Sequence, residues 1–109
     1  MNLQTAWIYL FIAGLFEIAW AVGLPYTKGF SRLWPSIYVL VMMLISFFCL
    51  SQSVKTLPIG TAYAIWTGIG AAGTAIIGIA FLGEPLHALR VLCIVMIVFG
   101  TIGLKILHG

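Results

Sequence analysis

The sequence predicts an all-α integral membrane protein with four transmembrane helices, and three observations lead to this prediction. Of its 109 residues, 63% are hydrophobic and only 6% are charged, whereas soluble domains carry about 25% charged residues. The apolar residues form four long runs, and about 20 such residues cross a bilayer as one helix. Glycine and proline lie in the short breaks between runs, so we expect residues 1–109 to form a single four-helix membrane domain.

The first predicted helix, residues 6–24, holds a single charged residue, Glu17. At a rise of 1.5 Å per residue, Glu17 lies about 3 Å from the middle of this run, and therefore from the bilayer centre. Insertion scales assign an aspartate at a helix centre a cost of roughly 2.5 to 3.5 kcal/mol. A carboxylate at this depth therefore indicates a functional site.

The second and third predicted helices span residues 35–54 and 59–82. Pro35 fits the first turn of a helix, where its missing N–H is not needed. A Gly-Glu-Pro sequence closes the third helix, and we interpret its Glu84 as a solvated or helix-start charge.

The fourth predicted helix spans residues 89–107. It carries Arg90 near its start and Lys105 near its end, from where both side chains can extend to the membrane surface.

The basic residues do not cluster, which argues against a nucleic-acid partner. Lys28, Arg32 and Arg90 belong to connections on one side of the membrane, whereas Lys55 and Lys105 belong to the other side. Orientation follows an excess of Lys and Arg on one side, and here the excess is slight. We therefore expect insertion in both orientations; the alternative is that loop placement or one dominant helix decides.

Glu17 also predicts a dimer, because two copies are the smallest assembly that encloses it away from lipid. If both orientations occur, the dimer is antiparallel. Gly100 and Gly103 share one face of the fourth helix and are candidate dimer contacts. Gly68 and Gly70 mark a predicted bend in the third helix. The alternative for all four is the ordinary glycine content of membrane helices.

Four further residues are candidates for a pocket around Glu17: Trp20, Ser46, Tyr63 and Trp66. Trp20 lies one turn after Glu17, and Ser46 is the central polar residue of the second helix. Tyr63 and Trp66 share a stripe of the third helix and offer donors and ring faces. The alternatives are that these aromatics belong to interfacial belts and that Ser46 bonds a carbonyl of its own helix.

The chemistry that these residues suggest is exchange of a cation for protons. A low-dielectric environment favours the protonated carboxyl, and two such acids in a dimer titrate as a coupled pair. A carboxylate beside aromatic faces also suits an organic cation, and a planar cation can add paired hydrogen bonds. The sequence shows no ATP motif, nucleophile, cofactor loop or metal spacing, so we expect neither an enzyme nor a cofactor.

Several stretches resemble the small multidrug resistance transporters, and in particular their guanidinium exporter branch. The matching stretches are residues 14–21, 29–33, 55–70 and 103–105. The resemblance implies a four-helix, dual-topology, antiparallel homodimer of the bacterial inner membrane. It further implies exchange of guanidinium for protons at Glu17, a pocket lined by Trp20, Ser46, Tyr63 and Trp66, a kink at 68–70 and dimer contacts on the fourth helix.

One departure from the family pattern concerns Pro25, which stands where the family usually has lysine. This proline should end the first helix at Leu24. It leaves open a changed substrate range, or a subunit that pairs with a related chain instead of with itself.

Two alternatives to a guanidinium/proton antiporter remain at this point. One is a broader exporter of quaternary ammonium compounds in the same family. The other is a structural or rotor-type membrane subunit with one buried acid, although such subunits are usually two-helix hairpins with the acid in the second helix.

Overall fold

The computed structural model describes residues 2–108, and within them it contains helices and no strand. The helices are α1 (Leu3–Gly23), the short 3-10 helix η1 (Leu24–Thr27), α2 (Leu33–Ser53), α3 (Ile59–Phe81) and α4 (Ala88–His108). Each of the four α-helices is long and apolar enough to cross a membrane. The predicted fold class of four transmembrane helices is therefore confirmed, while residues 1 and 109 of the predicted domain lie outside the described residues.

α1 begins earlier than the apolar run because Asn2 caps it. The Asn2 side chain accepts a hydrogen bond from the Thr5 backbone N–H at 2.8 Å, which satisfies one of the free donors of the first turn. The helix ends at Gly23, where the sequence led us to expect Leu24. The chain then continues through η1, whose first turn contains Pro25, because proline fits a helix start but cannot donate to a preceding turn.

The connection from η1 to α2 is a compact turn around Thr27. This side chain is 1% exposed; its hydroxyl donates to the Leu24 carbonyl at 2.8 Å and accepts from the Phe30 N–H at 3.2 Å. These bonds hold the connection close to the end of α1.

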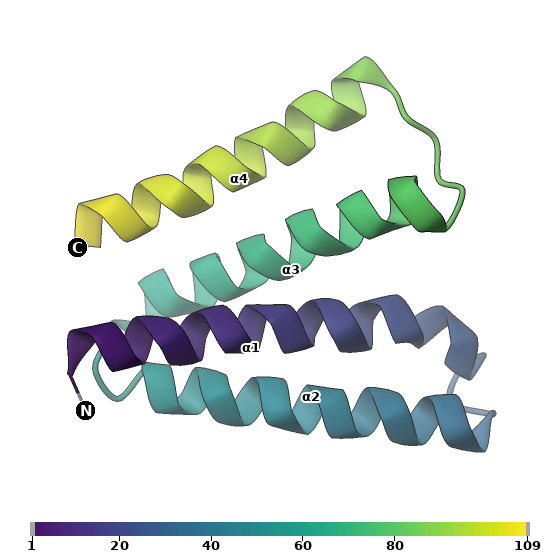
Figure 1. The fold of residues 1–109 in the computed structure, drawn as a ribbon, viewed down its shortest axis with the longest axis horizontal. Coiled ribbons are helices and arrows are strands. Elements are labelled where there is room, and N and C mark those ends of the chain that lie inside the picture. The colour runs from purple at the N-terminus through teal and green to yellow at the C-terminus, as the bar shows by residue number, and fades with distance from the viewer. Residues whose placement is uncertain (1, 109) are drawn as a thin grey trace.

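α1 is the central helix of the molecule, with α2 on one side and α3 on the other (Figure 1). α4 packs on the outer side of α3, and none of its described side chains is fully buried. The α1–α2 and α3–α4 connections share one end of the molecule, while the N-terminus, the α2–α3 connection and the C-terminus lie at the other (Figure 1).

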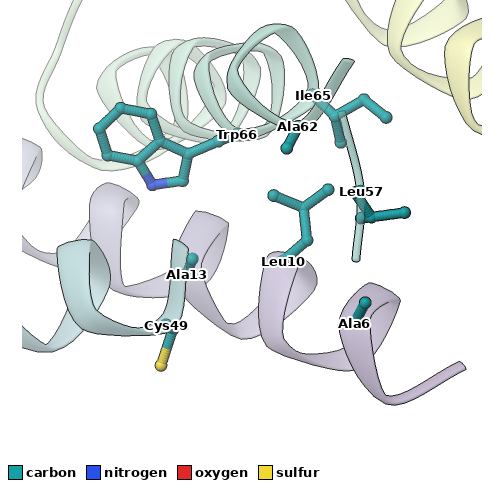
Figure 2. Packing of buried hydrophobic residues seen from close by; sticks show 8 residues of the cluster. All are labelled: Ala6, Leu10, Ala13, Cys49, Leu57, Ala62, Ile65 and Trp66. Carbon is teal, nitrogen blue, oxygen red and sulfur yellow. The ribbon is translucent and has the colours of Figure 1, made fainter. Parts of the chain in front are cut away.

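The hydrophobic core occupies the end near the α2–α3 connection (Figure 2). Leu10 of α1 is 1% exposed and points toward Ala62 of α3 and Leu57 of the connection (Figure 2). At the same end, the Lys105 ammonium of α4 lies 4.9 Å from the centre of the Trp7 ring of α1, a cation–π contact. The opposite ends of α1 and α3 do not contribute to this hydrophobic cluster.

Candidate functional site

Glu17 is buried in the second half of α1. Only 9% of its surface is exposed, and its Oε1 atom is fully buried with no hydrogen-bond partner among the described residues. Its carboxylate lies directly against Gly70 of α3, in the space that a Cβ would need. Buried polar atoms normally find a partner, so this oxygen makes Glu17 a candidate site residue.

A cavity of about 410 Å³ adjoins Glu17. It is lined by Glu17, Ala21, Val22, Pro25, Thr67, Gly70, Ala71, Thr74, Ala75, Leu82 and Glu84. These residues come from the second half of α1, from α3 and from both connections at one end of the molecule. The cavity therefore extends from the buried acid toward the end that carries the α1–α2 and α3–α4 connections.

Small and polar residues of α3 create this space. Thr67, Gly70, Ala71, Thr74 and Ala75 follow the spacing of one helix face, so the wall opposite Glu17 carries no large side chain. The Thr74 hydroxyl oxygen is fully buried and has no hydrogen-bond partner in the described part of the chain, whereas the Thr67 hydroxyl donates to the Tyr63 carbonyl.

Ser46 joins all three helices of the core. Its hydroxyl donates to the Ala13 carbonyl of α1 at 2.6 Å and accepts from the Trp66 indole N–H of α3 at 3.0 Å. The expected alternative, a bond to the carbonyl of its own helix, is therefore wrong. The Trp66 ring is buried and lies 5.6 Å from the ring of Tyr63 between centroids.

The structure thus brings three of the predicted pocket residues together, Ser46, Tyr63 and Trp66, but none of them lines the cavity beside Glu17. Trp20 does not line it either; its indole N–H is buried and has no partner among the described residues. That these side chains contact a substrate stays a prediction.

The predicted glycine roles also stay predictions. α3 runs unbroken from Ile59 to Phe81, and Gly68 and Gly70 give room to Thr101 and Glu17 respectively. Gly100 and Gly103 of α4 face open space, as a contact surface for another chain would.

Sequence reasoning did not assign Pro25, Thr67 and Glu84 to the site, and it placed Thr74 on the stripe of the third helix that carries Tyr63 and Trp66 without giving it a role. Thr67 and Thr74 could have been found from the sequence, because they share one face of α3 with the small residues Gly70, Ala71 and Ala75. No sequence pattern indicates Glu84, because it reaches the cavity from the α3–α4 connection and not from a helix face. There its Oε1 accepts a hydrogen bond from the Arg90 guanidinium at 2.7 Å.

Comparison with known proteins identifies the family. The family described as Small Multidrug Resistance protein matches residues 5–97. This chain belongs to the small multidrug resistance family. Curated relatives named guanidinium exporter are 60% identical in Proteus vulgaris and Salmonella typhimurium and 54% identical in Escherichia coli. Each comparison covers 93% of this chain and 96% or 97% of the relative.

Family membership and the four long apolar helices both indicate a membrane protein. The chain is a multi-pass protein of the bacterial inner membrane, and its family indicates a transporter and not an enzyme. The described residues also contain no group of side chains that could hold a metal ion. That Glu17 binds a transported cation stays a prediction.

Proposed function

We propose that this protein exports guanidinium in exchange for protons, and that Glu17 binds both in competition. The observation that carries the proposal is the buried, unpaired carboxylate oxygen of Glu17 at the edge of the cavity. Relatives that cover nearly the whole chain are named guanidinium exporters, which supports this choice of cation.

The chemistry of Glu17 fits a small planar cation. Guanidinium presents parallel N–H groups, and a carboxylate accepts two of them side by side in a short, charge-assisted pair. Trp20, three positions further along α1, carries an aromatic ring and an indole N–H that has no partner among the described residues, and we propose that both turn to the cation and the carboxylate when the substrate binds. The cavity wall of glycine, alanine and threonine leaves room for this cation beside the acid.

Exchange follows if the same carboxylate is either protonated or cation-bound. A buried carboxylate without a partner is costly, so Glu17 takes up a proton when the cation leaves. Reorientation of only the loaded forms then couples the two flows, as in alternating access. Ser46 holds α1 and Trp66 together through hydrogen bonds one turn before Glu17, at the Ala13 carbonyl.

We further propose that the working unit is an antiparallel homodimer, so that two Glu17 carboxylates share one site. The exposed apolar surface of α4 and the open space beside Gly100 and Gly103 support a second copy there. Pairing with a related subunit is the alternative.

The test uses purified protein in liposomes that contain a pH-sensitive dye. With an acidic interior, we expect labelled guanidinium to enter the wild-type vesicles as protons leave, and a protonophore to abolish the accumulation. Glu17→Gln keeps the size of the side chain but cannot ionise, so both fluxes should disappear. Guanidinium uptake that ignores the pH gradient, or that survives in Glu17→Gln, would refute the proposal.

The same vesicles distinguish the second cation class. A wild type that transports tetramethylammonium but not guanidinium would identify a quaternary ammonium exporter, the alternative that the sequence left open.

A further inference from the structure

Both acidic residues of this sequence line the same cavity. The 109 residues contain two Asp or Glu residues in total, Glu17 and Glu84, and no other charged residue belongs to the lining. Glu17 lies at the buried end, whereas Glu84 reaches the cavity from the α3–α4 connection. A cavity whose only charged lining residues are acidic favours cations over anions.

Glu84 and Glu17 occupy successive positions along α3. The Glu17 carboxylate lies against Gly70 and the Glu84 carboxylate against Gly78, which corresponds to about 12 Å along the helix axis at 1.5 Å per residue. Thr74 lies midway between the two glycines, lines the cavity and carries the unpaired hydroxyl oxygen. Side chains that carry oxygen atoms thus belong to the lining at the outer end, the middle and the buried end of the cavity.

Glu84 retains the capacity to contact a cation despite its ion pair. Arg90 donates to only one of its oxygens, Oε1, at 2.7 Å, and Arg90 itself is not a lining residue. The two side chains are 45% and 38% exposed, and ion pairs at such exposure are weak because water screens them. The ion pair therefore fixes the position of the Glu84 side chain and reduces its effective negative charge without cancelling it.

We propose that Glu84 is a second cation-contacting carboxylate, which attracts the substrate into the outer end of the cavity and passes it to Glu17. The inference rests on the proposed cation transport and adds an entry residue to it. Arg90 prevents Glu84 from holding the cation too tightly, because passage requires binding that is favourable for entry yet weak enough for release.

A purely structural role for Glu84 makes a different prediction. If the Glu84–Arg90 pair only fastened the α3–α4 connection, removing either partner would have the same effect. If Glu84 attracts the cation, removing Glu84 weakens substrate capture, whereas removing Arg90 leaves Glu84 more negative and strengthens it.

The experiment measures initial guanidinium uptake against concentration for the wild type, Glu84→Gln, Glu84→Asp and Arg90→Gln. At low ionic strength we expect Glu84→Gln to raise KM about tenfold, within the range of electrostatic effects on capture, with little change in maximal rate. Glu84→Asp should recover most of the loss, and Arg90→Gln should leave KM unchanged or lower it. The effect of Glu84→Gln should shrink in 1 M salt, where the Debye length falls to about 3 Å.

Three outcomes would overturn the inference: an unchanged KM in Glu84→Gln, equal losses in Glu84→Gln and Arg90→Gln, or a loss that does not respond to salt. Failure of the proposed function looks different, because then the wild type itself does not transport guanidinium. In that case the same four proteins are compared with tetramethylammonium, and a wild type that transports neither cation overturns both proposals.

Discussion

The backbone of Gly70 is what allows a carboxylate to lie between α1 and α3. A Cβ at this position would occupy the place of the Glu17 carboxyl group, so glycine here is a requirement of the site and not only of helix packing. Elsewhere along the same helix pair the partner of a glycine is aliphatic: a Cβ at Gly14 would lie 2.6 Å from Ile69. Close helix contact is thus general in this protein, but only one such contact holds the buried acid.

The substitution Gly70→Ala tests this dependence. The new methyl group must displace the Glu17 carboxylate, and a shift of about 1 Å in a reacting or binding group can cost a hundredfold in rate. We expect guanidinium transport to fall at least tenfold while the protein still elutes as a folded species on size exclusion.

Gly60→Ala is the matched control for Gly70→Ala. It makes the same change in α3 at a position that faces open space, where alanine should stabilise the helix by up to about 1 kcal/mol. Transport should remain at the wild-type level. If both variants transport equally well, Gly70 does not shape the site of Glu17.

At the scale of elements, the short helix η1 determines which residue of the α1–α2 connection lines the outer end of the cavity. Because α1 ends at Gly23, the chain turns early and places Pro25 in the cavity lining together with Leu82 and Glu84. An uncharged residue at this point leaves the two carboxylates as the only charges of the lining. A positive charge at position 25 would therefore act directly on an entering cation.

The substitution Pro25→Lys is expected to raise the KM for guanidinium several-fold at low ionic strength. The added ammonium repels the cation and partly neutralises the nearby carboxylates, and both effects fade as salt shortens the Debye length below 10 Å. The measurement is the initial rate of guanidinium uptake in liposomes at low and high salt.

Pro25→Gln separates charge from loss of the proline ring. This variant should keep KM close to that of the wild type, because it adds a side chain without a charge. If the glutamine and lysine variants shift KM equally, backbone flexibility and not electrostatics governs this position.

How far the sequence predicts this protein depends on the scale of the feature. The four helices follow from apolar runs, and the position of Glu17 follows from its place within one run, because both are local properties. The hydrogen bond from Ser46 to Ala13 and the ion pair of Glu84 with Arg90 cannot be predicted from such local properties. They depend on how α2 packs against α1 and on the path of the α3–α4 connection, and neither has a periodic signal.

At the scale of the whole molecule, the buried core and the cavity beside Glu17 lie toward opposite ends of the described structure. The core lies toward the α2–α3 connection, and the cavity lies toward the other two connections. α4 stands apart with an exposed apolar surface that includes Leu92, Met96 and Phe99. A single copy therefore leaves surface on α4 for lipid or for a second chain, and the orientation of that second chain depends on how each copy enters the membrane.

Dual topology is the last prediction, and it follows from the distribution of basic residues between the two ends. Lys28, Arg32 and Arg90 lie at one end and Lys55 and Lys105 at the other, so the positive-inside rule selects neither orientation strongly. In a variant with Cys49 and Cys93 replaced by alanine, we expect a membrane-impermeant maleimide to label about half of the Ser31→Cys protein in intact cells.

The matched variant Thr56→Cys places the label at the opposite end, where about half should again react. Ser31 and Thr56 are both exposed, so complete labelling after permeabilisation shows that each site is reactive. Full labelling at one end with none at the other would establish a single orientation. An antiparallel homodimer would then be excluded, and this chain would need an oppositely oriented partner subunit to form an antiparallel pair.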